Sequence, residues 1–264
     1  MGIVNVTPDS FSDGGHYLAA DQAIAHGLRL ALEGADLVDV GAESTRPGAE
    51  RVSAHEEKRR LLPVVAGLVQ AGVRVSVDTM RAEVAAAAVA SGAQMVNDVS
   101  GGLADPDMAG TVADLGVPYV AMHWRGHSDR MTRLATYRDV VAEVREELHR
   151  RLDALVAAGV REDQIIVDPG LGFAKLPQHD WALLRRLDVL QQLGRPVLVG
   201  ASRKSFLGRL VEQATGSVRP PAERDALTGA VSALAAAAGC YAVRVHDVRS
   251  NRDAVAVAAA WRAH

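Results

Sequence analysis

The chain has 264 residues, of which 48% are hydrophobic and 23% are charged. This composition excludes extended disorder, and the length suits either two ordinary domains or one α/β barrel of about 250 residues. The formal net charge of −3 argues against a dedicated nucleic-acid surface, so any anionic ligand must be bound by a local cluster of cations. A single cysteine, Cys240, excludes an intrachain disulfide, and no apolar run is long enough to span a membrane. We therefore expect a cytoplasmic protein.

Short runs of aliphatic residues alternate with longer helical segments along the whole chain. The expected strands are 2–6, 37–41, 73–78, 94–99, 119–123, 165–168, 197–201 and 242–246. Each run is apolar on both faces, which is typical of strands that are covered on both sides in a parallel sheet.

The segments between these strands have the composition and spacing of helices. They are 21–33, 54–70, 81–91, 106–114, 137–158, 181–192, a split region from 205 to 238, and 251–262. Eight β-then-α units use nearly the whole length, which predicts one (β/α)₈ barrel domain over residues 1–264 with its active site at the C-terminal strand ends. A doubly wound open sheet is the alternative, although the chain lacks a G-x-G-x-x-G after the first strand.

Polar residues stand at the end of every expected strand. Any one of them could merely cap the following helix, but their presence at all eight ends favours a polar barrel mouth that binds a polar guest. These residues are Asn5, Asp39, Asp78, Asn97 with Asp98, His123, Asp168, Ser202 with Arg203 and Lys204, and Arg244 with His246 and Asp247.

The predicted mouth divides by chemistry into two halves. Asp78, Asn97 and Asp168 suit the N–H edge of a nitrogen heterocycle, and Asn5 can give one amide oxygen to a Mg²⁺ ion that also takes water and phosphate oxygens. The cations suit a phosphate or a carboxylate; they are Arg46, Arg203, Lys204, Arg244 and His246. Long loops after the first two strands, which carry Asp13 and Arg46, are expected to act as lids or substrate loops.

Eight motifs occur in order at the expected strand ends. They are NVTPDSFSDGG at 5–15, GAESTRPG at 41–48, SVDTMRAEVA at 76–85, MVNDVSGG at 95–102, MHWRG at 122–126, DPGLGFAK at 168–175, VGASRKSFLG at 199–208 and RVHDV at 244–248. Together they resemble the dihydropteroate synthase family over essentially the whole chain, and its actinobacterial members most closely. Ala42 departs from the family's usual glycine at that position.

The resemblance implies a homodimeric transferase of folate biosynthesis. Such an enzyme condenses 6-hydroxymethyl-7,8-dihydropterin diphosphate with 4-aminobenzoate, and it releases 7,8-dihydropteroate and diphosphate. Because the dihydropterin ring can spread positive charge from its CH₂ group, we expect an SN1-like substitution. Sulfonamides mimic 4-aminobenzoate, and the loop at 43–52 carries no extra residues of the kind found in insensitive relatives, so we expect inhibition by sulfonamides.

The resemblance also implies a role for each matching residue. The catalytic set is Asp13, Asp168, Lys204 and Arg244, and the pterin set is Asp78, Asn97, Met122, Asp168 and Lys204. The diphosphate set is Asn5, Arg46, Arg244 and His246, with Asn5 also the contact for Mg²⁺. The 4-aminobenzoate set is Thr45, Arg46, Pro47, Phe173, Lys204 and Ser205.

Two other functions remain open from the sequence. A methyltetrahydrofolate-binding methyltransferase barrel would share the pterin-binding acids and amide, but it would not use a diphosphate site or the SRKS motif at 202–205. A catalytically silent paralogue would bind a pterin or a partner protein without turnover. Release of diphosphate that depends on 4-aminobenzoate and Mg²⁺ would separate these functions.

Overall fold

The computed structural model describes residues 1–6, 16–43, 51–127, 131 and 133–263, with the side chains of 16–18 left out. The strands are short and parallel, and they occur close to the expected positions. They are β1 (Gly2–Asn5), β2 (Val38–Gly41), β3 (Val75–Asp78), β4 (Met95–Asp98), β5 (Tyr119–Met122), β6 (Ile165–Asp168), β7 (Leu198–Val199) and β8 (Ala242–Val243).

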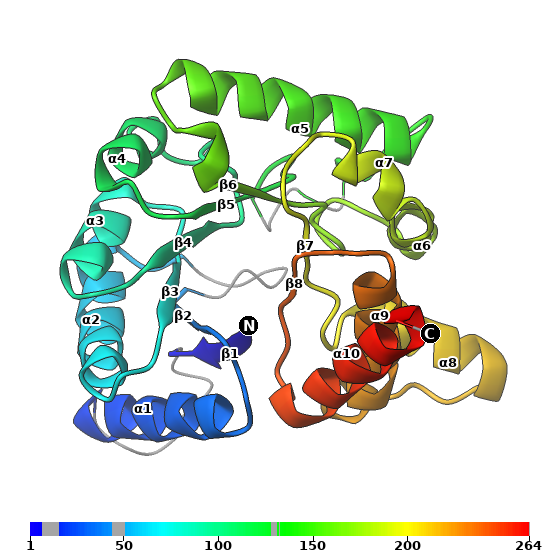
Figure 1. Cartoon of the computed structure of the whole chain (residues 1–264), viewed down its shortest axis with the longest axis horizontal. Helices are drawn as coiled ribbons and strands as arrows, with labels where there is room; N and C mark the ends of the chain where they lie inside the picture. Colours follow the sequence, from blue (N-terminus) through cyan, green and yellow to red (C-terminus); the bar gives the residue numbers. More distant parts are fainter. Residues whose placement is uncertain (7–15, 44–50, 128–130, 132, 264) are drawn as a thin grey trace.

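The strands close into a barrel. Strands β1 to β6 form one parallel sheet in sequence order, and β7 pairs with β8. Two parallel bridges join these sheets, Val167 with Val197 on one side and Gly2 with Val245 on the other. Because both edges of the sheet are paired, the predicted (β/α)₈ barrel is confirmed, and an open doubly wound sheet is wrong for this chain (Figure 1).

Helices form the outer ring of the barrel (Figure 1). They are α1 (His16–Leu32), α2 (Ala54–Gln70), α3 (Ala82–Ala90), α4 (Met108–Leu115), α5 (Val140–Ala157), α6 (Pro177–Arg185), α7 (Leu187–Gln191), α8 (Ser205–Thr215), α9 (Asp225–Ala237) and α10 (Val248–Ala263). The expected helix at 181–192 is divided, because the backbone of Arg186 leaves the helical region with φ −126° and ψ 40°. None of the helices that the structure describes is long and apolar enough to cross a bilayer.

Side chains alternate between the barrel interior and the helix layer along each strand. Met95, Val120, Ile166 and Leu198 form a buried cluster of their own, which fills the interior. The residues two positions further along three of these strands are Asn97, Met122 and Asp168, so they face the same interior at its C-terminal end. Val96, Tyr119 and Val167 belong to the larger cluster between the strands and the helices.

Asp98 belongs to the outer layer, so its predicted place at the mouth is wrong. Its Oδ1 accepts hydrogen bonds from the N–H and the hydroxyl of Ser100, both at 2.7 Å, and its Oδ2 accepts one from Gly102 N–H at 2.7 Å. The Tyr119 hydroxyl donates to Oδ2 at 2.8 Å. Burial raises the pKa of Asp98 and these hydrogen bonds oppose that rise, so the carboxyl group stabilises the turn after β4.

Removal of the Tyr119 hydroxyl therefore tests a contact that supports the fold without reaching the mouth. Tyr119→Phe should lower the free energy of unfolding by about 1–3 kcal/mol, because a fully buried acceptor loses one of its donors. Urea denaturation measures this loss. The control is Glu212→Gln at an exposed position of α8, which should leave stability unchanged, and an equal stability of both variants would contradict the prediction.

Candidate active site

Arg244 joins carboxylates from two neighbouring strands at the C-terminal end of the barrel. Its Nε donates to Asp39 Oδ2 and its Nη2 donates to Asp78 Oδ2, both at 2.6 Å. The side-chain amide of Asn97 donates to the same Asp39 oxygen at 2.9 Å. Burial raises the pKa of Asp78 to about 7 although Arg244 acts to lower it. Strands β2, β3, β4 and the segment after β8 therefore meet in one network of polar side chains.

Asp168 and Lys204 form the second part of the site. A Cβ atom built on Gly200 would lie 3.6 Å from Asp168 Oδ2 and 3.9 Å from Lys204 Nζ, so both groups reach the same space above β7. Burial raises the pKa of Asp168 and lowers that of Lys204, while each charge acts on the other in the opposite direction. Lys204 also donates to the carbonyl oxygen of Leu171 and lies 4.8 Å above the ring centre of Phe173.

Ser202 and His246 meet between the ends of β7 and β8. The Ser202 hydroxyl oxygen accepts a hydrogen bond from the backbone N–H of His246 at 3.1 Å, and it lies 2.9 Å from Nδ1 of the same residue. The hydroxyl can donate to Nδ1 or accept from it, and in either case it fixes the orientation of the imidazole ring. The histidine predicted for the diphosphate is therefore oriented by a neighbouring serine.

The remaining described residues of the predicted site lie around this centre. Asn5 ends β1 and is partly exposed, and Met122 is buried at the end of β5. Phe173 is partly buried in the segment after β6. Ser205 is exposed at the first position of α8, where free backbone N–H groups favour an anion. Asp13, Thr45, Arg46 and Pro47 lie outside the described residues.

Two predictions about cations and imidazoles at the mouth are wrong. Arg203 makes a bidentate pair with Asp225 of α9, with both distances 2.7 Å, so its charge is used within the protein. His123 is turned outward from the barrel, with its Nε2 2.9 Å from Glu147 Oε2 on α5. In both residues the side chain points to a helix, whereas the sequence placed them only by their position after a strand.

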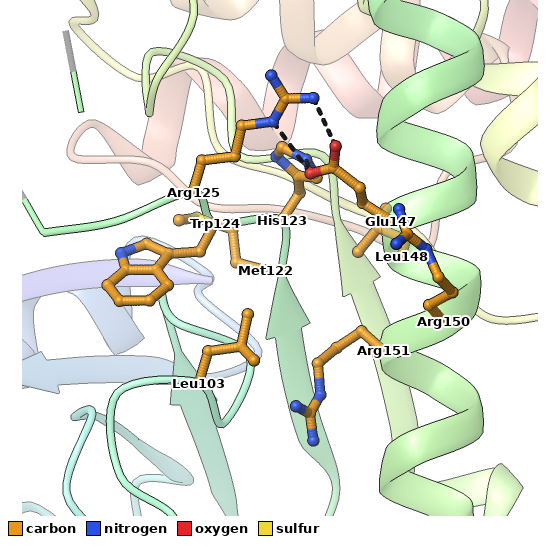
Figure 2. Close-up of a pocket in the computed structure, with 9 residues that line it drawn as sticks. All are labelled: Leu103, Met122, His123, Trp124, Arg125, Glu147, Leu148, Arg150 and Arg151. Atoms are coloured by element: carbon orange, nitrogen blue, oxygen red, sulfur yellow. Dashed lines mark hydrogen bonds and ion pairs between the residues drawn. The ribbon is translucent and has the colours of Figure 1, made fainter. Parts of the chain in front are cut away.

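The same region borders an open pocket of about 470 Å³ between the end of β5 and α5 (Figure 2). It is lined by Leu103, Met122, His123, Trp124, Arg125, Glu147, Leu148, Arg150 and Arg151. Met122 and His123 are the two lining residues that the sequence placed at the barrel mouth. The lining contains neither Arg244 nor the two carboxylates that Arg244 binds.

The described residues contain no group of three or more histidine, cysteine or acidic side chains that could hold a metal ion. A dedicated protein cage for a metal is therefore absent from this part of the chain. The hard amide oxygen of Asn5 at the mouth fits a Mg²⁺ ion that takes its other ligands from water and substrate.

Sequence reasoning placed Asp39 at a strand end but gave it no role. In the structure it is fully buried, and one of its oxygens binds both Asn97 and Arg244. Its other oxygen, Oδ1, is buried and has no hydrogen-bond partner among the residues that the structure describes. The alternation of side chains along β2 was the available signal, since Asp39 lies two residues beyond Leu37 on the interior face.

Asp39→Asn should disturb the network because it removes the charge that faces the Arg244 guanidinium. We expect the free energy of unfolding to fall by about 2–4 kcal/mol, since a buried cation then loses one of its two partners. Chemical denaturation measures the loss. Asp188→Asn is the matched control, because Asp188 pairs with Arg186 on the surface; equal stabilities of the two variants would show that Asp39 does not support Arg244.

Comparison with known proteins identifies the family. Residues 1–246 match the family model described as pterin binding enzyme. The chain is 56% identical to the dihydropteroate synthase of the actinobacterium Mycobacterium leprae, over 99% of this chain and 92% of that protein. The Xanthomonas albilineans dihydropteroate synthase solved with 4-aminobenzoic acid superposes with a TM-score of 0.91 and 46% identity, over 100% of this chain and 93% of that one.

Two further complexes belong to the same comparison. The X. albilineans enzyme with 7,8-dihydropteroate superposes with a TM-score of 0.88 and 44% identity, over 100% of this chain and 93% of that one. The Yersinia pestis dihydropteroate synthase with a sulfonamide drug superposes with a TM-score of 0.92 and 38% identity, over 100% of this chain and 94% of that one. With this identity over its full length and the same barrel, the chain belongs to the dihydropteroate synthase family of pterin-binding enzymes.

Proposed function

We propose that the chain joins 6-hydroxymethyl-7,8-dihydropterin diphosphate to 4-aminobenzoate, with 7,8-dihydropteroate and diphosphate as products. The observation that carries this proposal is the meeting of two kinds of group at one mouth. Asp78, Asn97 and Asp168 can read the edge of a heterocycle, and Lys204 and Arg244 supply positive charge beside them. The relatives solved with 4-aminobenzoic acid and with 7,8-dihydropteroate support the same substrate class.

The reaction is a substitution at the CH₂ group of the pterin. The C–O bond breaks and the diphosphate leaves with its electron pair, while the ring spreads the positive charge left on carbon. The amine nitrogen of 4-aminobenzoate then forms the C–N bond and loses one proton to solvent. An arylamine is nucleophilic without a strong base, so no side chain is assigned as an obligatory general base.

Asp168 and Asn97 hold the pterin in this proposal. The Asp168 Oδ1 atom accepts from Gly170 N–H at 2.7 Å, which fixes the carboxylate at the end of β6. Its Oδ2 atom faces the space that it shares with Lys204. A carboxylate beside the heterocycle favours the cationic form of the ring, so the developing charge is stabilised where it forms.

Arg244 and His246 bind the departing diphosphate. The two carboxylate partners of Arg244 use its Nε and Nη2 atoms, which leaves Nη1 for a phosphate oxygen. A bound Mg²⁺ ion, for which Asn5 offers one amide oxygen, would neutralise part of the diphosphate charge. The Ser202 hydroxyl, 2.9 Å from Nδ1, fixes the orientation of the His246 ring.

The 4-aminobenzoate site lies between the segment after β6 and the start of α8. Phe173 and the Lys204 stem give apolar contact, and the N-terminus of α8 at Ser205 suits the carboxylate. The predicted contributions of Thr45, Arg46 and Pro47 to this pocket, and of Asp13 to cation stabilisation, fall on residues outside the described part of the chain.

The test is a coupled assay for diphosphate. The purified protein should release diphosphate only when 4-aminobenzoate and Mg²⁺ are both present, and a sulfonamide should raise the apparent KM for 4-aminobenzoate.

Asp168→Asn should lower kcat/KM for the pterin diphosphate by about 10²-fold, the scale of one preorganised electrostatic group. The control is Asp163→Asn, which changes an exposed acid and should leave kcat/KM as in the wild type. Pterin binding without diphosphate release would favour the silent paralogue, and methyl transfer from a methylated folate would favour the methyltransferase.

We further propose that the chain forms a homodimer through α9, α10 and the segment before β8. Four large apolar side chains are exposed there: Leu234 (69%), Tyr241 (62%), Val257 (66%) and Trp261 (82%). The small residues of α9 are divided between two faces: Gly229, Ser232 and Ala235 are buried within the chain, whereas Ala226 and Ala230 are exposed. Exposed aromatic and aliphatic groups of this size are typical of a surface that another protein covers.

Trp261→Glu should weaken dimer formation at least about tenfold, because a buried tryptophan commonly dominates an interface. Analytical ultracentrifugation over a range of concentrations measures the dissociation constant. Leu32→Glu on α1 is the matched control, since that side chain is 89% exposed on another helix. A monomeric wild-type protein, or equal behaviour of the two variants, would refute this interface.

A further inference from the structure

A buried lysine, Lys175, follows β6 near the proposed site and has no role in the proposed chemistry. Lys175 is 8% exposed in the segment between β6 and α6. Its amino group contacts three acceptors: it lies 2.9 Å from Nδ1 of His123 and donates to the carbonyl oxygens of Gly170 and Phe173, both at 3.0 Å. These contacts offset part of the cost of burying the amino group, although burial still lowers the pKa of Lys175 to about 7 against the charges of Asp180 and Asp168.

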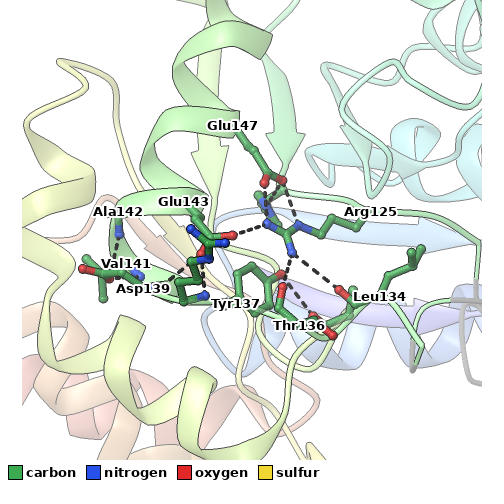
Figure 3. A network of polar contacts seen from close by, with 12 residues as sticks. Arg125, Leu134, Thr136, Tyr137, Asp139, Val141, Ala142, Glu143 and Glu147 are labelled. Atoms are coloured by element: carbon green, nitrogen blue, oxygen red, sulfur yellow. Dashed lines mark hydrogen bonds and ion pairs between the residues drawn. The ribbon is translucent and has the colours of Figure 1, made fainter.

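His123 connects Lys175 to helix α5. The Glu147 carboxylate can only accept, so Nε2 of His123 carries the proton and donates to Glu147 Oε2 at 2.9 Å, and Nδ1 of the neutral ring accepts from Lys175. Arg125 donates to Glu147 and to Glu143, with its guanidinium 3.8 Å above the Tyr137 ring centre (Figures 2 and 3). Burial lowers the pKa of His123 to about 4, so the ring is neutral, as this order of donors requires.

The segment that Lys175 contacts has an unfavourable backbone conformation. Gly170 and Gly172 have φ of +66° and +75°, and Ala174, which is not a glycine, has φ of +48°. A Cβ atom on Gly170 would lie 2.4 Å from the carbonyl oxygen of His123, so this turn packs directly on the end of β5. Such a turn persists only when its surroundings hold it.

The two groups of the proposed site that contact this turn are Asp168 and Lys204. Gly170 N–H donates to Asp168 Oδ1, and the Leu171 carbonyl accepts from Lys204. Lys175 binds the carbonyl groups of Gly170 and Phe173, which lie on either side of Leu171 and Gly172. A shift of the turn would therefore displace the ring of Phe173 and change the contact that Lys204 makes.

We propose that Lys175 is a positioning residue for the 4-aminobenzoate pocket, which it holds in shape by anchoring the turn at residues 170–173 to His123 and thereby to α5. This role rests on the proposed function for its kinetic consequence, while the anchor itself is a property of the fold. Lys175 acts through Phe173 and does not touch the substrates.

Lys175→Met tests the anchor because it keeps the length of the side chain and removes every donor. The amide hydrogens of residues 170–173 should exchange with solvent about tenfold faster in this variant, since the turn opens more often. Hydrogen–deuterium exchange with mass spectrometry measures the rate. Lys58→Met is the matched control, because Lys58 pairs with Glu83 at the surface of α2, and it should leave these amides as in the wild type. Unchanged exchange in Lys175→Met would overturn the proposal.

Steady-state kinetics with both substrates test the effect on the pocket. Lys175→Met should raise KM for 4-aminobenzoate at least about tenfold, with a smaller effect on KM for the pterin diphosphate. The same change in a Phe173→Ala background should have little further effect, because the two residues act through one contact. Equal losses in both backgrounds would show a general loss of structure instead, and unchanged KM values in the single variant would also refute the role.

Two further measurements keep the outcomes separate. If Lys175→Met does not fold, Lys175→Gln retains two donors and receives the same exchange and kinetic measurements. If the wild type shows no 4-aminobenzoate-dependent release of diphosphate, the proposed function fails, and the exchange rates still decide whether Lys175 anchors the turn.

Discussion

The ion pairs of Arg244 with Asp39 and Asp78 are the interaction on which the mouth of the barrel depends. Three acids, Asp39, Asp78 and Asp168, lie at one end of a closed ring of strands, where Asp39 and Asp168 are buried and Asp78 is partly buried. Their mutual repulsion would be severe without the guanidinium group between two of them. Because one Asp39 oxygen also binds Asn97, the position of the arginine is linked to the residue that is expected to read the pterin. Charge compensation and substrate recognition thus share the same atoms.

The closed barrel is the reason that so much of the site followed from the sequence. Apolar runs covered on both faces indicated a parallel sheet, and the carboxyl ends of its strands had to meet at one mouth. Helix α2 (Ala54–Gln70) begins and ends at the expected residues. Its start is fixed by Ser53, whose hydroxyl oxygen accepts a hydrogen bond from Glu56 N–H. The inner positions Asp78, Asn97 and Asp168 lie where they were expected.

The errors have a common physical cause. A one-residue difference in position on a strand moves a side chain to the other face, so Asn97 points inward while Asp98 binds Tyr119 in the helix layer. Arg203 could not be assigned because its partner, Asp225, lies on a helix that the sequence showed only as a split region. Lys175 gave no signal of its own in the motif, since its acceptors are backbone carbonyls and a histidine from another strand.

The carboxyl groups of the outer and inner networks differ in how the protein shifts their pKa. On the outer side, partial burial acts to raise the pKa of Glu147, but hydrogen bonds from His123 and Arg125 lower it to about 2, so the carboxylate is ionised. On the inner side, burial raises the pKa of Asp168 and lowers that of Lys204, and their mutual attraction does not overcome this. The His123 backbone N–H, which donates to the Asp168 carbonyl at 2.8 Å, joins the two layers at the strand ends. The outer network is thereby linked through the backbone to the strand end that carries Asp168.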